Sequence, residues 1–117
     1  ARVYAHLRRI RRPEAEQRFA FGTVVVDRTA GEAYKDGVKV ELTAREFKLL
    51  EFMIQREGRV ITRQMILDGV WGEEYFGTDR TVDNFITRLR QKFDEEEPRY
   101  FQTVRGMGYR FRGDSST

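Results

Sequence analysis

The chain has 117 residues, enough for about one domain with a single modest core. Because it contains no cysteine, disulfides, thiolate zinc sites and cysteine nucleophiles are excluded. His6 is the only histidine, so a histidine-based catalytic triad or multi-histidine metal site inside the domain is excluded too. No apolar run approaches the ~20 residues that a membrane span needs, and the N-terminus lacks the apolar segment of a signal peptide. We therefore expect no membrane contact and a reducing compartment such as the cytoplasm.

The net charge of +3 conceals an uneven distribution of charge along the chain. Residues 1–18 carry six arginines against two acids, residues 80–92 carry four basic residues against one acid, and residues 99–112 carry four arginines and no acid. Acidic residues gather instead at 73–79 and 94–97. This alternation predicts one basic face that suits a polyanionic partner, with random surface charge as the alternative.

Residues 1–12 are compatible with a helix that Pro13 ends. Nothing caps the start of this helix, so we interpret residues 1–17 as the end of a preceding element and a linker in a longer protein. The alternative is a basic arm that contacts nucleic acid or lipid.

Residues 18–42 have the pattern of short β-strands. Alternating aromatic residues at the start of this segment are followed by the β-branched run 23–26. Asp36-Gly37 is a dipeptide suited to a two-residue type I′ hairpin. The segment predicts an antiparallel meander with one apolar face, in a packing role without a ligand site.

A capping box marks the start of the first helix, with Thr43 as N-cap and Glu46 three residues later. The helix is predicted to run to about residue 57 and to end at Gly58. Its inward-facing residues are expected to be Phe47, Leu50, Met53 and Ile54. A short extended bridge, residues 60–61, follows.

Thr62 is the predicted N-cap of a second helix that ends near residues 69–71. Its apolar residues are Ile66, Leu67 and Val70. The acidic, aromatic loop 72–78 separates it from a third helix, for which Asp79 is the predicted N-cap.

The third helix, residues 80–92, has two different faces. Apolar residues at helical spacing are Val82, Phe85, Ile86, Leu89 and Phe93. The polar face holds Asn84, Thr87, Arg88 and Gln91, flanked by Arg80, Thr81 and Arg90. Short polar groups mixed with arginines are the chemistry that reads base edges and phosphates in a DNA major groove. A solvated outer face is the alternative.

Acidic residues 94–97 and Pro98 are interpreted as a stop and a loop. Two short strands, residues 100–105 and 108–112, then form a tight hairpin, and residues 113–117 are expected to be a disordered tail. The predicted fold class is α+β: a winged helix-turn-helix with an N-terminal antiparallel β-sheet, a three-helix core and a C-terminal β-hairpin wing. The third helix would enter the major groove, and the wing would contact the backbone or the adjacent minor groove.

Enzymatic chemistry has no support in the sequence, and no cofactor is expected. The paired acids Glu73 and Glu74 lie on a loop without a histidine or second carboxylate placed by spacing. Gly106 and Gly108 are read as turn glycines, since a lone GxG is poor evidence for a nucleotide site. A winged-helix module that binds proteins without DNA is the alternative to DNA binding.

Three motifs in this order resemble the effector domain of OmpR/PhoB-type response regulators, the DNA-binding transcription factors of bacterial two-component systems. They are LTAREFKLLEFMIQREGRVITRQMILDGVW, RTVDNFITRLRQKF and YFQTVRGMGYRF, and the last contains the family's TVRGxGYRF at residues 103–111. The resemblance covers roughly residues 19–112, so we expect a DNA-binding domain at 18–112. It implies a phosphorylated receiver domain before this segment, with residues 1–17 as its end and linker. It also implies head-to-tail dimers on direct-repeat DNA, and contact of loop 71–79 with RNA polymerase or a neighbouring protomer.

The resemblance also implies roles for individual residues. Positions that match phosphate contacts are Arg63, Arg80, Thr81 and Arg90. Positions that match wing contacts are Thr103 and Arg105, with Arg105 as the candidate minor-groove arginine. Arg88 matches a position that often reaches base edges.

Five further positions are candidate contacts, and three of them, Phe85, Trp71 and Arg110, have a second reading. Asn84 and Thr87 fall where family members vary, and Asn84 could pair with adenine. Phe85 could complete the core face or touch a thymine methyl, and its helical spacing favours the core. Trp71 is read as a packed anchor that could also contact a phosphate. Arg110 could contact phosphate or be solvated.

Overall fold

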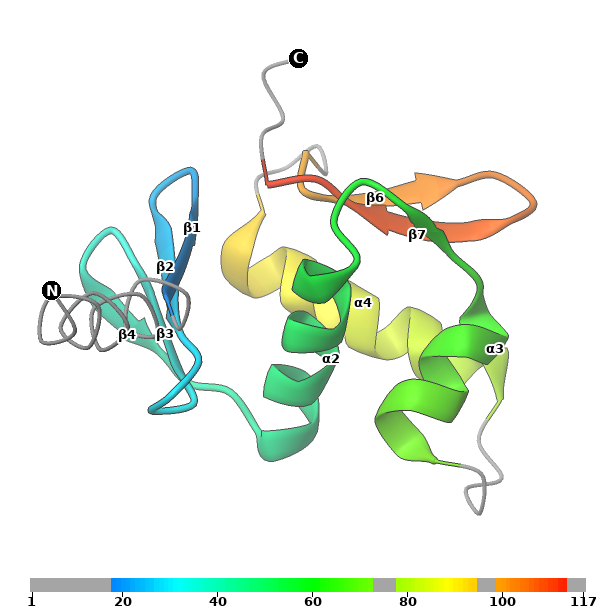
Figure 1. Cartoon of the computed structure of the whole chain (residues 1–117), viewed down its shortest axis with the longest axis horizontal. Coiled ribbons are helices and arrows are strands. Elements are labelled where there is room, and N and C mark those ends of the chain that lie inside the picture. Colours follow the sequence, from blue (N-terminus) through cyan, green and yellow to red (C-terminus); the bar gives the residue numbers. More distant parts are fainter. Residues whose placement is uncertain (1–17, 73–77, 95–98, 114–117) are drawn as a thin grey trace, which may run out of the picture. The chain divides into compact units, whose positions relative to one another are not determined.

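The computed structural model describes residues 18–72, 78–94 and 99–113, and they divide into two compact units, residues 1–41 and 42–117 (Figure 1). The predicted receiver end and linker at residues 1–17, most of loop 72–78, acids 95–97 with Pro98, and tail residues 114–117 lie outside the described residues. The domain boundaries remain predictions.

The first unit is an antiparallel sheet of strand order β1-β2-β3-β4. The strands are β1 (Arg18–Phe21), β2 (Val24–Asp27), β3 (Glu32–Lys35) and β4 (Val38–Val40). Lys35 pairs with Val38 across Asp36 and Gly37, whose φ angles of 53° and 80° match the predicted type I′ turn. One face is apolar and buried, as predicted, through Phe21, Val24, Val26 and Ala33.

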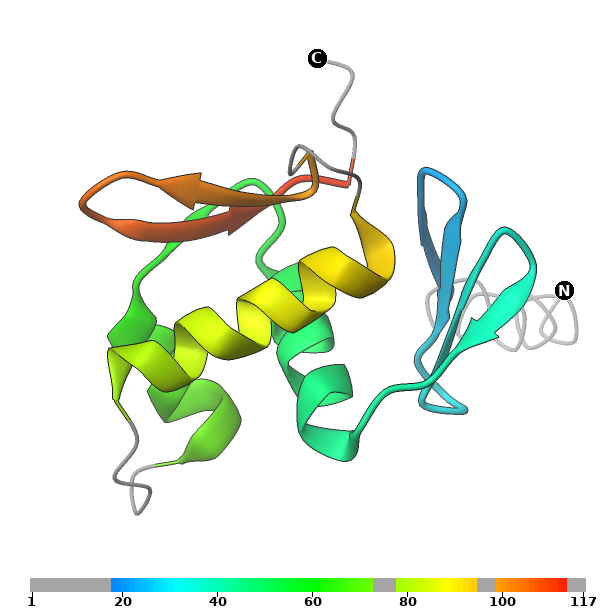
Figure 2. The same ribbon diagram turned by 180° about the vertical axis from the view of Figure 1, so that it is seen from behind.

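The second unit holds three helical segments and a three-stranded sheet (Figure 2). They are α2 (Ala44–Gln55), β5 (Val60–Ile61), α3 (Arg63–Ile66) continued by the π-helical segment η1 (Leu67–Trp71), α4 (Asp79–Phe93), β6 (Phe101–Val104) and β7 (Gly108–Phe111). The sheet order is β5-β7-β6, all antiparallel, so the bridge after α2 joins the hairpin. The predicted α+β fold with a three-helix core and a C-terminal hairpin is confirmed.

Local caps fix where the helices begin. Thr43 Oγ1 accepts from the Glu46 N–H at 3.1 Å, and Glu46 Oε1 accepts from the Thr43 N–H at 3.0 Å, which is the predicted capping box. Thr62 caps α3 through a hydrogen bond from the Met65 N–H at 3.1 Å, also as predicted.

The predicted N-cap of the third helix was wrong by one residue. Thr78, not Asp79, has the extended N-cap backbone, and its N–H donates to the Thr81 hydroxyl at 3.4 Å. Both residue types favour an N-cap, so composition alone does not separate them. Asp79 becomes the first residue of α4, where its negative charge interacts favourably with the positive end of the helix dipole.

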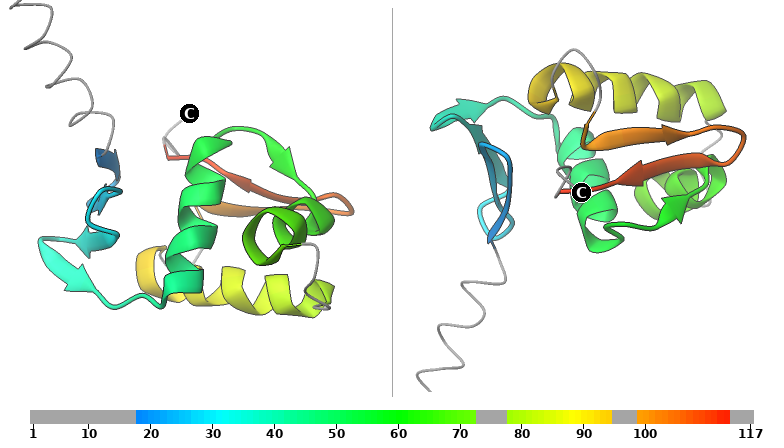
Figure 3. Two further views of the ribbon diagram at one scale, coloured as in Figure 1. Left: turned by 60° about the horizontal axis from the view of Figure 1, so that its bottom comes forward. Right: turned by 90° about the horizontal axis from the view of Figure 1, so that it is seen from above.

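Helix α4 lies across the unit and contacts α2, α3 and β6 (Figures 2 and 3). The fully buried residues of these helices are Leu49, Leu50, Met53, Ile66, Val70, Val82, Ile86 and Leu89. Phe101 and Phe111 of the hairpin are also fully buried, with ring centroids 5.2 Å apart. The helical apolar pattern therefore predicted most of this core, while Leu49 was missed and Phe47 is only half-buried.

Asp94 follows the end of α4, as the predicted stop requires, and it has a further role that the sequence did not indicate. Its side chain is buried, and Oδ1 accepts from the Arg99 N–H at 2.8 Å. Oδ2 accepts from the N–H groups of Tyr100 and Phe101, each at 3.0 Å. These bonds fix where the chain enters β6. They join residues five to seven positions apart, so helical periodicity in the sequence does not predict them.

The second helix is not uniform. Its four-residue α3 segment continues as η1, whereas the sequence predicted one regular helix. A Cβ at Gly69 would lie 2.1 Å from a Phe52 ring carbon, so this position needs glycine for η1 to approach α2. Among the described residues, no helix is long and apolar enough to cross a membrane.

Candidate nucleic-acid interface

The outer face of α4 is polar, and its inner face is buried. Exposed residues of this helix are Asp79, Arg80, Asn84, Thr87, Arg88 and Gln91. Val82, Ile86, Leu89 and Phe93 anchor the opposite face, with at most 1% of each exposed. Anchoring from behind holds the exposed side chains in a fixed pattern, as reading a nucleic-acid groove requires.

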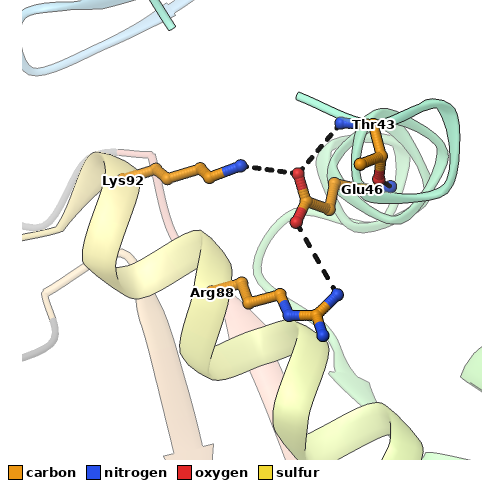
Figure 4. Close-up of polar contacts among 4 residues, drawn as sticks. All are labelled: Thr43, Glu46, Arg88 and Lys92. Atoms are coloured by element: carbon orange, nitrogen blue, oxygen red, sulfur yellow. Dashed lines mark hydrogen bonds and ion pairs between the residues drawn. The ribbon is translucent and has the colours of Figure 1, made fainter. Parts of the chain in front are cut away.

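Arg88 is the predicted base-reading residue, and its side chain is 51% exposed. Its guanidinium carbon lies 4.6 Å from the centroid of the Phe85 ring. One terminal nitrogen lies 3.9 Å from Glu46 Oε2 on α2 (Figure 4). Stacking on one side and a carboxylate on the other limit the rotamers of a long side chain.

Glu46 is itself held by several groups. Lys92 Nζ donates to Oε1 at 2.6 Å, in addition to the capping bond from the Thr43 N–H (Figure 4). Burial by itself would raise the pKa of the Glu46 carboxyl, but the hydrogen bonds from Lys92 and Thr43 and the charge of Arg88 outweigh it and lower that pKa. The carboxylate is thus kept ionised between two helices.

Phe85 lies at the edge of this face rather than in the fully buried core. Its ring meets Trp71 edge-on, with centroids 5.0 Å apart. The Arg45 guanidinium lies 5.4 Å from the Trp71 centroid and donates to the Val70 carbonyl at 2.8 Å. Trp71 is therefore packed between α2 and α4, as the anchor reading predicted. Contact of Phe85 with a base stays a prediction.

Arg63 was predicted to contact phosphate, and in this structure it pairs with Asp83 on α4. Its Nε lies 2.8 Å from Asp83 Oδ1, and the Tyr109 hydroxyl donates to the same oxygen. Burial acts to raise the pKa of the Asp83 carboxyl, yet the bonds from Tyr109 and Arg63 hold that pKa below its usual range. Burial and the bond to Asp83 raise the pKa of Tyr109. One carboxylate therefore joins α3, α4 and β7.

Arg90 was also predicted to contact phosphate, but it links α4 to β6. Its Nε donates to the Phe101 carbonyl at 2.8 Å, and a terminal nitrogen donates to Thr103 Oγ1 at 2.7 Å. Thr103, a predicted wing contact, remains exposed while accepting this bond. Arg90 and Thr103 thus already bond to each other. A phosphate contact at either residue would add to this bond or displace it.

Of the predicted wing residues, Arg105 lies in the turn of the hairpin, and Arg110 lies within strand β7. Arg105 is exposed next to Gly106, which has a φ of 76° in the turn. Arg110 is half-buried, and its Nε donates to Gln102 Oε1 at 3.3 Å across the β6–β7 pair. Strand β6 of the hairpin contacts α4 (Figure 3). Arginine from the wing and arginine from α4 therefore belong to one compact unit.

Two residues of the site were missed by sequence reasoning. Glu46 was assigned only to the capping box, and Asp83 received no role. The available signal for Asp83 was its position as the one acid within residues 80–92. Among the described residues, no group of three or more acidic or histidine side chains is placed to hold a metal ion.

Helix α4 has a polar outer face and a buried inner face, and it follows a pair of helices and precedes a hairpin that carries arginines. This arrangement defines the class of winged-helix domains that bind nucleic acid. Residues 37–111 match the family described as "Transcriptional regulatory protein, C terminal". The chain belongs to this family and is of the OmpR/PhoB type. It is 40% identical over 112 residues to the transcriptional regulatory protein AfsQ1 of Streptomyces coelicolor, covering 94% of this chain and 49% of that protein. The chain thus spans about half the length of this curated relative.

Solved structures agree with this fold. The response regulator DrrB, an OmpR/PhoB homolog of Thermotoga maritima, is 32% identical, with a TM-score of 0.76 over 82% of this chain and 44% of its own. The RstA DNA-binding domain of Klebsiella pneumoniae, solved in complex with the RstA box, is 31% identical, with a TM-score of 0.74 over 83% of this chain and 98% of its own.

Proposed function

We propose that this chain binds double-stranded DNA sequence-specifically as the effector domain of a two-component response regulator. The observation that carries the proposal is the outer face of α4, where exposed arginines and short polar groups stand on a buried apolar face. A helix of this kind fits the major groove, and the arginine-bearing wing fits the adjacent minor groove and backbone. The RstA domain solved with its DNA box has the same fold, which supports the proposal.

Roles within the interface divide by exposure and by existing partners. Arg88 and Asn84 are proposed to read bases, and the exposed Arg80 to bind backbone phosphate. Arg105 is proposed to enter the minor groove from the wing. Thr87 is exposed on the same face and is a further proposed contact. The remaining proposed contacts, with intramolecular bonds or partial burial in this structure, are Arg63, Trp71, Thr81, Arg90, Thr103 and Arg110.

Further partners follow from the length of the relatives and from the family resemblance. A phosphorylated receiver domain in the same protein would control a head-to-tail dimer on direct-repeat sites. Loop 71–79 would contact RNA polymerase. Each of these partners is proposed, and the regulated sites depend on the base preference of α4.

Selection of duplexes from a random DNA pool, followed by gel shifts, tests the proposal. We expect enriched sites, affinity that falls by roughly one log unit per log unit of salt for each phosphate neutralised, and uniform weakening by Arg80→Ala. Arg88→Ala should relax base preference at one position by about 1–3 kcal/mol. Equal binding of every duplex would contradict sequence-specific recognition. No binding to any duplex would favour the protein-interaction module.

A further inference from the structure

The Glu46 carboxylate lies between two cations of α4 that it holds unequally (Figure 4). Lys92 Nζ is 2.6 Å from Oε1, whereas the nearest Arg88 nitrogen is 3.9 Å from Oε2. The Glu46 side chain is 4% exposed, and that of Arg88 is 51% exposed. The ion pair with Arg88 is therefore the loose one of the two.

This inequality decides what Arg88 can do. A buried carboxylate must keep partners, and Lys92 and the Thr43 N–H supply them on Oε1. Arg88 can then leave Glu46 without stranding a buried charge. Until it leaves, its guanidinium is held between the Glu46 carboxylate and the face of Phe85.

Release of Arg88 from Glu46 has different consequences for a contact with a backbone phosphate and for a contact with a base edge. A backbone phosphate replaces one anion by another, so the Coulomb energy of Arg88 changes little, although the guanidinium fork can bond two phosphate oxygens, and this contact is the same at every sequence. A guanine edge offers two acceptors, O6 and N7, at a place fixed by the base sequence, so Arg88 gains from this contact only at a matching site.

We infer that Glu46 is a positioning residue that restrains Arg88 in the free protein and yields it to a base edge with two acceptors. The restraint raises the ratio of specific to non-specific affinity. This inference rests on the proposed DNA-binding function. Glu46 touches no DNA in this scheme and acts through Arg88.

A double-mutant cycle on the 117-residue chain tests the inference. The probes are a duplex selected by the wild type from random DNA and a scrambled duplex of the same composition. Glu46→Gln retains a side chain able to complete the capping box but lacks the charge that holds Arg88. We expect it to raise affinity for the scrambled duplex about fivefold and to lower the specificity ratio about fivefold, with less than about twofold change in an Arg88→Gln background.

Glu51→Gln is the matched control for loss of one negative charge. Glu51 lies on the same helix, about 140° around its axis from Glu46 at ~100° per residue. It should leave the specificity ratio unchanged. An equal effect of Glu46→Gln with and without Arg88 would overturn the inference while leaving the proposed function intact. A wild type without any duplex preference would overturn both.

The Nε–Hε signal of Arg88 in ¹H–¹⁵N spectra gives a readout that a purely structural role of Glu46 would not move. In the free wild type we expect a restrained, resolved signal. The selected duplex should shift it, and the scrambled duplex should leave it near its free position. This titration needs no variant, so it can contradict the inference even if Glu46→Gln fails to fold. Equal shifts with both duplexes would contradict the inference.

Discussion

The Tyr109 hydroxyl on β7 donates a hydrogen bond to the Asp83 carboxylate on α4. The same oxygen accepts from Arg63 Nε at the start of α3. The proposed recognition helix, the helix before it and the wing therefore share one acceptor. This carboxylate therefore contributes to their relative orientation, in addition to the apolar core and the bonds from Arg90 to β6.

Removal of the Tyr109 hydroxyl should destabilise the second unit. Tyr109→Phe is expected to lower the free energy of unfolding by about 1–2 kcal/mol, because a buried hydroxyl bonded to a charged acceptor is lost. Asp83→Asn should cost a similar amount, and the two changes should be coupled by about 1 kcal/mol. Urea unfolding of the two single variants and the double variant measures this. Strictly additive effects would contradict a direct bond.

Acid should destabilise the protein through Asp83 and Glu46. Both carboxyl groups have a pKa below the usual range, so the unfolded chain binds more protons than the folded one as the pH falls. Their stabilisation is present above the ordinary carboxyl pKa of about 4 and is lost as the pH drops below it. Thermal unfolding between neutral and acid pH should show this loss. The profile of an Asp83→Asn, Glu46→Gln variant should be flatter, and an unchanged slope would contradict the assignment.

Glycine should be essential at position 108 and merely preferred at position 106. A Cβ at Gly108 would lie 2.1 Å from the Ile61 carbonyl oxygen, where β5 pairs with β7. At Gly106 a Cβ meets nothing within 4 Å, so only its φ of +76° opposes a side chain. We expect a loss of about 1–2 kcal/mol for Gly106→Ala and about 2–5 kcal/mol for Gly108→Ala. Chemical denaturation checks the difference, and equal losses would contradict the close approach of β5.

Arg90 and Arg80 should behave differently although both were predicted to contact phosphate. Arg90→Ala should lower the free energy of unfolding by about 1–2 kcal/mol, because it removes the bonds to Phe101 and Thr103. Arg80 is exposed, so Arg80→Ala should change stability by less than about 0.5 kcal/mol while weakening DNA binding. Denaturation and gel shifts on both variants separate the two roles. Equal stabilities would mean that the links from Arg90 contribute little.

Features encoded by neighbouring residues were predictable. The capping box of Thr43 and Glu46, the cap at Thr62 and the turn at Asp36-Gly37 each involve residues at most three apart, and each is present in the structure. Helical periodicity likewise identified the buried face of α4, because a 3.6-residue repeat shows in the sequence itself. The motifs at the hairpin identified the family.

Features that join distant segments were not predictable from local patterns. Asp94 looked like one of four acids after a helix, and only folding places it under the N–H groups that open β6. Gly69 looked like an ordinary helix end, and its need for glycine arises from the Phe52 ring of another helix. In each case the partner lies beyond the reach of a helical turn or a hairpin.

For the arginines, the sequence gives their positions, and only the tertiary structure gives their partners. Their number and positions on the third helix and the hairpin are properties of the sequence, and they suffice to predict a basic DNA-binding face. Tertiary structure alone decides which of them already have partners: Arg63 with Asp83, Arg90 with β6, and Arg88 loosely with Glu46. The physical reason is that a charge acts over distance in space and not along the chain. The restraint of the Arg88 guanidinium therefore depends on Glu46, which lies 42 positions away and was predicted from the sequence only as part of a helix cap.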